Sequence, residues 1–232
     1  MPCSETLAPL QTAVEIRLGS SQLLLLPEKA AWAPSTEELF LSDLHLGKAQ
    51  AFRSHGLPIP EGSVSEDLER LHRLFNQLRP KQCWVLGDLF HSNHGQSKSL
   101  AQQLTLWRQK HPEIRLTLLT GNHDQKVRHW PSEWNLRREL EATAACGLHL
   151  RHHPRNPPGD HPTLVGHLHP GIRLRSGTRF LPLRPAFILE DQQLILPAFG
   201  SLTGCCRIHR SENTRYFILA ENRVREIPAQ LL

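Results

Sequence analysis

The chain has 232 residues, enough for one sizeable hydrophobic core, and we expect a single domain over residues 1–232. Hydrophobic residues make up 39% of the chain and charged residues 21%, a composition that excludes a disordered or fibrous protein. The formal net charge of +5 permits a polyanionic partner but does not require one.

Apolar runs and helical periodicity predict alternating strands and helices over the first two thirds of the chain. In chain order, these elements are a hairpin over residues 14–26, a strand at 39–41, a helix at 63–78 that Pro80 ends, a strand at 83–86, a helix at 97–110, a strand at 116–119, a helix within 132–145, and strands at 148–150 and 163–165. After residue 173, short β-type runs at 180–181, 186–189, 194–196 and 216–219 predict a meander. The sequence therefore predicts an α/β fold that ends in a β-rich third.

The cysteines and the apolar runs indicate the compartment. Five cysteines, an odd number with no CxxC spacing, indicate reduced thiols in a cytoplasmic protein. The N-terminus has no basic region followed by a long apolar stretch, so we expect no signal peptide. The apolar run at 23–26 is far too short to cross a membrane, and we expect no membrane partner.

Five polar clusters stand out because each one directly follows an apolar, strand-like run. They are Ser42-Asp43-Leu44-His45, Gly87-Asp88-Leu89-Phe90-His91, Thr120-Gly121-Asn122-His123-Asp124, His152-His153-Pro154 and Gly166-His167-Leu168-His169-Pro170. Each cluster alone is common by chance. In open α/β sheets, however, ligand sites lie at the carboxyl ends of the strands, so five clusters in this placement predict one shared site.

The residue types in these clusters favour a pair of divalent metal ions. Carboxylate, amide oxygen and imidazole groups without thiolates suit hard or borderline ions. Two ions about 3.5–4 Å apart need a shared ligand, and the Asp88 carboxylate is the candidate bridge. Asp43 and His45 lie two residues apart, so in an extended segment their side chains would point the same way, and the same parity would bring His167 and His169 together.

This ordered set of clusters resembles the calcineurin-like metallophosphoesterase superfamily. The resemblance implies that one metal binds Asp43, His45, Asp88 and His169, and that the other binds Asp88, Asn122, His152 and His167. It also places His123 beside the leaving group with Asp124 orienting its ring, although Asp124 would serve equally as a helix N-cap. His91 is a candidate to line the pocket, with an ordinary loop histidine as the alternative.

The fourth cluster leaves two candidates for one ligand, because His152 and His153 are adjacent. A strand with Leu148 and Leu150 facing inward would place His152 on the buried face. Pro154 follows two residues later, as the family pattern has it, and also favours His152.

Further stretches resemble one bacterial branch, the ligase-associated DNA damage response phosphoesterases. They are residues 42–48, 52–53 with 56–60, 87–92 and 196–201; at Gly204-Cys205 the chain departs from the Gly-Gly that the branch tends to show. The resemblance implies a four-layer α/β/β/α sandwich and a manganese-dependent endonuclease that cuts single-stranded DNA in DNA repair. It also implies a functional link to a DNA ligase, a helicase and an exonuclease.

In this hypothesis a metal-bound hydroxide attacks phosphorus in line, and basic residues near the motif loops contact the DNA backbone. The candidates for that contact are Lys48, Arg53, Arg151, Arg155, Arg173 and Arg175. One alternative is a phosphomonoesterase or a nucleotide or cyclic-nucleotide phosphodiesterase, because the same metal set handles small substrates. A second is an inactive phosphoesterase-fold scaffold that binds protein partners, although such proteins usually lack some of these motif residues.

Overall fold

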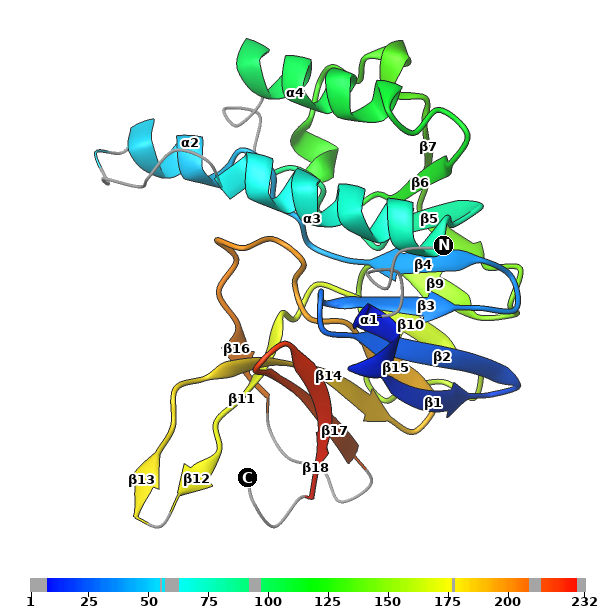
Figure 1. The fold of residues 1–232 in the computed structure, drawn as a ribbon, viewed down its shortest axis with the longest axis vertical. Coiled ribbons are helices and arrows are strands. Elements are labelled where there is room, and N and C mark those ends of the chain that lie inside the picture. Colours follow the sequence, from blue (N-terminus) through cyan, green and yellow to red (C-terminus); the bar gives the residue numbers. More distant parts are fainter. Residues whose placement is uncertain are drawn as a thin grey trace, which may run out of the picture.

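Two β-sheets pack face to face, and the two longest helices lie on the outer face of the first sheet (Figure 1). The computed structural model describes residues 8–54, 56, 63–91, 97–176, 178–208 and 214–228. No helix among these residues is long and apolar enough to cross a membrane. That residues 1–232 form one domain stays a prediction.

The first sheet has seven strands whose order in space follows their order in the chain. The strands are β1 (Val14–Leu18), β2 (Ser21–Leu26), β3 (Ala30–Ala33), β4 (Glu38–Leu41), β5 (Gln82–Val85), β6 (Arg115–Leu119) and β7 (Leu136–Glu139). Antiparallel hairpins join β1 to β4, whereas β4 to β7 run parallel. The carboxyl ends of these four parallel strands therefore share one edge of the sheet.

The helices lie in the connections between the parallel strands, after the short α1 (Ala8–Gln11). They are α2 (Lys48–Ser54), α3 (Ser63–Leu78) and α4 (Lys98–Gln109), followed by the 3₁₀ turns η3 (Asp124–Lys126) and η4 (Ser132–Trp134). The buried stripe of α3, with Leu68, Leu71 and Phe75, packs on the first sheet at the spacing expected from the sequence. The Ser97 side chain caps α4 by accepting a hydrogen bond from the Leu100 amide at 3.1 Å.

The second sheet contains nine strands. They are β8 (Glu141–Thr143), β9 (His149–Arg151), β10 (Thr163–Val165), β11 (Pro170–Ile172), β14 (Arg184–Glu190), β15 (Gln193–Ile195), β16 (Cys206–Arg207), β17 (Thr214–Ala220) and β18 (Arg223–Ile227). A separate two-stranded ribbon consists of β12 (Arg175–Ser176) and β13 (Arg179–Phe180). The β9, β10 and β15 strands run parallel, so the β9 and β10 carboxyl ends also share an edge.

Three hydrophobic clusters fill the layers. The first lies between the helices and the first sheet, the second lies between the two sheets, and a smaller third lies on the outer face of the second sheet. Leu168, Leu174 and Ile208 pack against this third cluster. The α/β sandwich is thus confirmed, but loop residues occupy the position of its outermost helical layer within the described part of the chain.

Glu38 ties the two sheets together through four hydrogen bonds. Its carboxylate accepts from the Trp84 indole at 2.9 Å and the Thr36 hydroxyl at 2.7 Å. It also accepts from the amides of Ala145 at 3.0 Å and Cys146 at 2.9 Å, which lie in the turn between β8 and β9. Burial alone would raise the pKa of Glu38, but these hydrogen bonds outweigh it and leave the pKa below 4.5.

Most of the elements expected from the sequence are confirmed, with one clear exception. The helix expected within residues 132–145 is wrong, because this segment forms η4, β7 and β8. Its Leu, Arg, Glu and Ala residues favour a helix, but parallel pairing of Leu136 with Leu116 extends the first sheet instead. No sequence pattern indicated α2, β3, β11, β16 or β18.

The described cysteines are consistent with the expected reduced thiols. Cys83, Cys146, Cys205 and Cys206 are all free, and Cys3 lies outside the described residues. Residues 57–60 and Ser92, which belong to the stretches that resemble the DNA damage response branch, also lie outside them.

Candidate metal centre

The five polar clusters meet at the edge where the carboxyl ends of the strands lie. Asp43 and His45 follow β4, Asp88 follows β5, Asn122 follows β6, His152 follows β9, and His167 and His169 follow β10. Backbone hydrogen bonds align the first two loops, since the Asp43 amide donates to Gly87 at 3.1 Å and the His45 amide donates to Asp88 at 2.9 Å. The structure therefore brings all seven expected ligands to one place, and their role as ligands stays a proposal.

The backbone of five of these residues is not extended. Asp43, His45, Asp88, His167 and His169 have φ values of 55°, 48°, 51°, 71° and 46°. The sequence predicts that these side chains converge because residues two apart in an extended segment point the same way. The side chains do converge, but that explanation is wrong because the backbone is not extended. Non-glycine residues seldom adopt this left-handed region, and such strain concentrates at functional sites where the surrounding structure holds it.

One group of donor atoms consists of Asp43, His45 and His169. The Nε2 atoms of His45 and His169 lie 3.3 Å apart, and Asp43 Oδ1 lies 3.2 Å from His169 Nε2. The buried Asp43 Oδ1 and His45 Nδ1 atoms have no hydrogen-bond partner among the described residues. Burial lowers the pKa of His45 to about 3, so its ring is neutral and offers a lone pair.

A second group surrounds His152. Its Nδ1 lies 2.8 Å from the Leu86 carbonyl and donates to it, so the lone pair that a neutral ring offers to a metal lies on Nε2. That lone pair faces His167 Nδ1 at 3.2 Å, Asn122 Oδ1 at 3.2 Å and Asp88 Oδ2 at 3.5 Å. A cation among these electron-rich atoms resolves their mutual repulsion, so the residues present fit a bound divalent metal.

Asp88 lies between the two groups, as expected of a bridging carboxylate. Its Oδ2 is 3.5 Å from His152 Nε2 and 3.9 Å from His45 Nε2, while its Oδ1 accepts the His123 amide at 2.9 Å. Burial raises the pKa of Asp88, but hydrogen bonds and charges from His152 and His123 outweigh burial and lower it to about 2. The carboxylate is therefore ionised at neutral pH.

Glycines allow these loops to approach so closely. A side chain at Gly87, which has a φ of 88°, would collide with the imidazole of His152. A side chain at Gly166 would collide with the Ser42 hydroxyl and come within 2.9 Å of Asp43 Oδ2. The glycines of the Gly-Asp and Gly-His motifs are thus required by contacts across the site.

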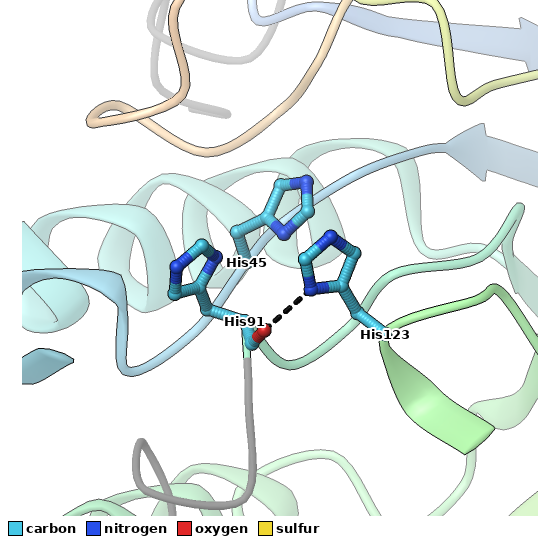
Figure 2. Close-up of side chains that lie close together, drawn as sticks. All are labelled: His45, His91 and His123. Atoms are coloured by element: carbon cyan, nitrogen blue, oxygen red, sulfur yellow. Dashed lines mark hydrogen bonds between the residues drawn. The ribbon is translucent and has the colours of Figure 1, made fainter. Parts of the chain in front are cut away.

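Three histidine rings gather at the rim of the centre, from the loops after β4, β5 and β6 (Figure 2). The His91 and His123 rings stack with centroids 5.3 Å apart, and His45 meets both rings edge-on. His123 Nδ1 donates a hydrogen bond to the His91 carbonyl, which directs Nε2 towards Asp88 Oδ2 at 4.0 Å. His91 therefore lies at the site, as expected, and its backbone fixes the orientation of His123.

Asp124 does not orient His123 as the resemblance implied. Its carboxylate accepts hydrogen bonds from the amides of Gly121 at 3.0 Å and Phe90 at 3.2 Å, and so joins the loops after β5 and β6. Burial raises the pKa of Asp124 to about 6, although these hydrogen bonds act to lower it. The structural role is closer to the capping alternative, since the side chain organises the turn that begins η3.

The basic residues proposed for substrate contact differ in how they relate to the centre. The Lys48 ammonium lies 5.7 Å from the centre of the Phe52 ring, and that ring lies 6.2 Å from His91. Lys48 thus stands at the His91 side of the site, where burial lowers its pKa. Arg53 is exposed in the last turn of α2, directly after Phe52 in the chain.

Two residues next to the expected ligands support the centre, although sequence reasoning assigned Ser42 no role and named His153 only as the alternative to His152. The Ser42 hydroxyl donates to Asp43 Oδ2, which also accepts the His167 amide at 2.9 Å. His153 is exposed, yet its ring centroid lies 4.2 Å from that of His167, so it stands beside the second group. Only their sequence positions next to Asp43 and His152 pointed to these two residues.

Two charged residues on α3, Asp67 and Arg70, bind the loop that contains Phe199 and Ser201, and no sequence pattern indicated these contacts. Asp67 accepts the Ser201 amide at 3.0 Å, while Arg70 donates to the Phe199 carbonyl and lies 4.1 Å from the centre of the Phe199 ring. The Phe199 amide in turn donates to the Ser42 carbonyl at 2.7 Å. These contacts fix the backbone that carries Asp43.

The chain resembles known proteins in sequence and in fold. Among solved structures, the chain resembles the nuclease MPE of Pseudomonas putida at 29% identity and a TM-score of 0.79, over 93% of this chain and 100% of that one. It also resembles Yfce, a phosphoesterase from E. coli, at 14% identity and a TM-score of 0.41, over 82% of this chain and 97% of that one. No curated protein matches the chain. The calcineurin-like phosphoesterase family matches over residues 39–225, so the chain belongs to this family and is a metal-dependent hydrolase.

Proposed function

We propose that the protein is a manganese-dependent endonuclease that cuts single-stranded DNA in DNA repair. The observation that carries the proposal is the pair of facing donor groups that share Asp88, with His123 at their rim. The resemblance to a nuclease over 93% of this chain supports a nucleic acid as the substrate. The excess of basic residues, with a net charge of +5, suits a polyanion.

In the proposed centre, Asp43, His45, Asp88 and His169 hold one metal, and Asp88, Asn122, His152 and His167 hold the other. Two divalent ions there would acidify an attacking water and neutralise charge on the phosphate. Asp88 supplies a negative charge to both positions because its pKa is about 2.

His123 has the geometry of a proton donor to the leaving oxygen. Its side chain is 29% exposed beside the 3%-exposed Asp88 carboxylate, so the substrate can reach the ring from the solvent side. Because Nδ1–H is committed to the His91 carbonyl, Nε2 carries a proton only in the imidazolium form. The ring thus serves as a general acid that is oriented by backbone rather than by a carboxylate.

The first experiment is manganese-dependent nicking of a closed circular single-stranded DNA, with Asp88→Asn and His123→Ala as test variants. His149→Ala is the matched control, because His149 is exposed at the start of β9 and its ring contacts only His161 among the described aromatic pairs. We expect linear products from the wild type and the control, none from Asp88→Asn, and at least about 100-fold slower cutting by His123→Ala.

The other outcomes separate the alternatives. An intact circle together with hydrolysis of bis-p-nitrophenyl phosphate would assign the site to a small phosphodiester, and hydrolysis of p-nitrophenyl phosphate alone would assign it to a monoester. No hydrolysis with any divalent metal would favour the scaffold. Cutting that is faster with another ion would overturn the assignment of manganese.

The proposed cellular role is cytoplasmic repair together with a DNA ligase, a helicase and an exonuclease. The free thiols of the four described cysteines are consistent with a reducing compartment. Loss of the gene should sensitise cells to DNA damage, and loss of both this gene and the ligase gene should sensitise them no further if the two act together.

A further inference from the structure

A narrow β-ribbon projects from the second sheet, at the end of the strand that follows the metal-site histidines. The β12–β13 ribbon extends the antiparallel pair of β11 and β14, and Figure 1 shows it as the protruding arm at the lower left. The β11 strand begins directly after His169, and Arg175 comes six residues after that histidine. At about 3.3 Å per residue, six residues span at most about 20 Å, so the arm begins within about 20 Å of the proposed ligand.

The arm exposes an aromatic ring to solvent. Phe180 is 59% exposed and Leu181 is 43% exposed, although Leu174 at the base packs into the third hydrophobic cluster. Among the residues that the structure describes, Phe180 is the only phenylalanine, tryptophan or tyrosine that is exposed. A water-facing phenylalanine on an anchored ribbon suits recognition of a partner better than packing.

The charge around this ring is of one sign. Arg173, Arg175, Arg179 and Arg184 are all exposed on the arm or at its base. The chain has no acidic residue between Asp160 and Glu190. In the strand register Arg175 lies directly opposite Phe180, so a guanidinium and an aromatic ring share one face of the ribbon.

We propose that this arm binds single-stranded DNA, with a base stacked on Phe180 and with backbone phosphates on the arginines. The inference rests on the proposed function, since it adds a second contact on the same strand of substrate, on an arm that begins within about 20 Å of the metal centre. Aromatic stacking within a positive track is how sequence-independent single-strand binding works. Self-association through Phe180 is opposed because it would bring the arginines of two copies together.

Fluorescence anisotropy of a labelled 20-mer of thymidine in manganese tests the arm, at NaCl concentrations from 50 to 300 mM. All proteins carry His123→Ala so that cutting is at least about 100-fold slower than in the wild type, and a gel after each titration checks that the strand is still whole. The test variants are Phe180→Ala and the pair Arg173→Gln with Arg179→Gln. The matched controls are Leu106→Ala, an exposed apolar side chain on α4, and Arg115→Gln, an exposed arginine at the start of β6.

We expect Phe180→Ala to raise the dissociation constant about tenfold without changing its salt dependence, because the substitution removes a stacking surface but no charge. The arginine pair should weaken binding and reduce the slope of log K against log salt by about 0.7 for each phosphate that the arginines no longer neutralise. The controls should bind like the parent, and the thermal midpoint of each variant should show that the fold is intact.

The outcomes keep this inference separate from the proposed nuclease. If the wild type cuts the DNA circle while the arm variants bind as tightly as the controls, the arm inference is wrong and the nuclease stands. If the protein that carries only His123→Ala binds the 20-mer through the arm while the wild type cuts no DNA, the arm inference stands and the proposed nuclease is wrong. A concentration-dependent dimer that Phe180→Ala dissolves, with DNA binding unaffected, would assign the arm to self-association and overturn the inference.

Discussion

Replacing Ser42 by alanine should weaken metal binding although Ser42 is not a ligand. Its buried hydroxyl donates to Asp43 Oδ2, while Asp43 Oδ1 faces His169 Nε2 at 3.2 Å. Without the hydroxyl, the His167 amide at 2.9 Å is the one donor to Oδ2 that remains among the described residues. The carboxylate then rotates more freely, and Oδ1 is less often directed at the metal position.

The size of the effect follows from this hydrogen bond. A hydrogen bond to a charged group contributes about 1.5–3 kcal/mol. If that contribution is lost from the bound state, metal affinity falls by about 10- to 100-fold, which is the range typical for residues that orient metal ligands. The free energy of unfolding without metal should fall by only about 1 kcal/mol, because the Asp43 oxygen keeps its second donor.

Isothermal titration calorimetry of manganese into the metal-free protein measures the affinity, and chemical denaturation measures the stability. Ser21→Ala is the matched control, because the buried Ser21 hydroxyl also donates one hydrogen bond, to the Cys146 carbonyl at 2.5 Å, away from the site. The control should lose similar stability and bind manganese like the wild type. A manganese affinity for Ser42→Ala within twofold of the wild type would refute the orienting role of the hydroxyl.

Three further predictions test the fold and the rim of the site. Glu38→Gln should destabilise the protein by about 2–4 kcal/mol at pH 7, because an amide cannot accept all four hydrogen bonds. Since the folded state lowers the pKa of Glu38 below 4.5, the stability that its carboxylate contributes is present above that pH and is lost as pH falls through the folded pKa. Chemical denaturation should therefore show a smaller difference in stability between the wild type and Glu38→Gln at pH 3 than at pH 7. Gly87→Ala should displace the His152 ring and reduce manganese affinity at least tenfold by calorimetry, because the added carbon collides with the imidazole. His91→Ala should slow cutting less than His123→Ala in the circular-DNA assay, because the backbone carbonyl that orients His123 remains.

The positions of the site residues could be predicted because they depend on topology. Apolar runs mark the parallel strands, and polar clusters mark where each strand ends, so convergence follows without knowledge of side-chain packing. The same is true of α3, whose apolar spacing alone identifies its buried face. The preference for His152 over His153 also agrees with burial, since His152 is 2% exposed and His153 is exposed.

The features that could not be predicted depend on contacts between distant backbone segments. Residues 136–139 are helix formers that become an edge strand, because β6 offers unpaired backbone groups beside them. The orientation of His123 comes from a carbonyl, and residue types carry no signal for a backbone acceptor. For the same reason, the order of residues in the chain favours His123 as the partner of Asp124. The Asp124 carboxylate instead accepts from the amides of Gly121 and Phe90.

The arrangement of the donors predicts that metal binding stabilises the fold. Five of the proposed ligands hold a left-handed backbone, and their donor atoms face one another at 3.2–3.9 Å. Both features oppose folding, and a bound cation removes the repulsion between the donors. Manganese at 100 times its dissociation constant should therefore raise the free energy of unfolding by about 2.7 kcal/mol. In Asp88→Asn the metal-free protein should unfold at a lower denaturant concentration, because the lowered pKa of Asp88 means that its ionised carboxylate stabilises the folded state at neutral pH, and manganese should add little. If manganese stabilised Asp88→Asn as much as the wild type, it would be binding elsewhere and the shared carboxylate would not be a ligand.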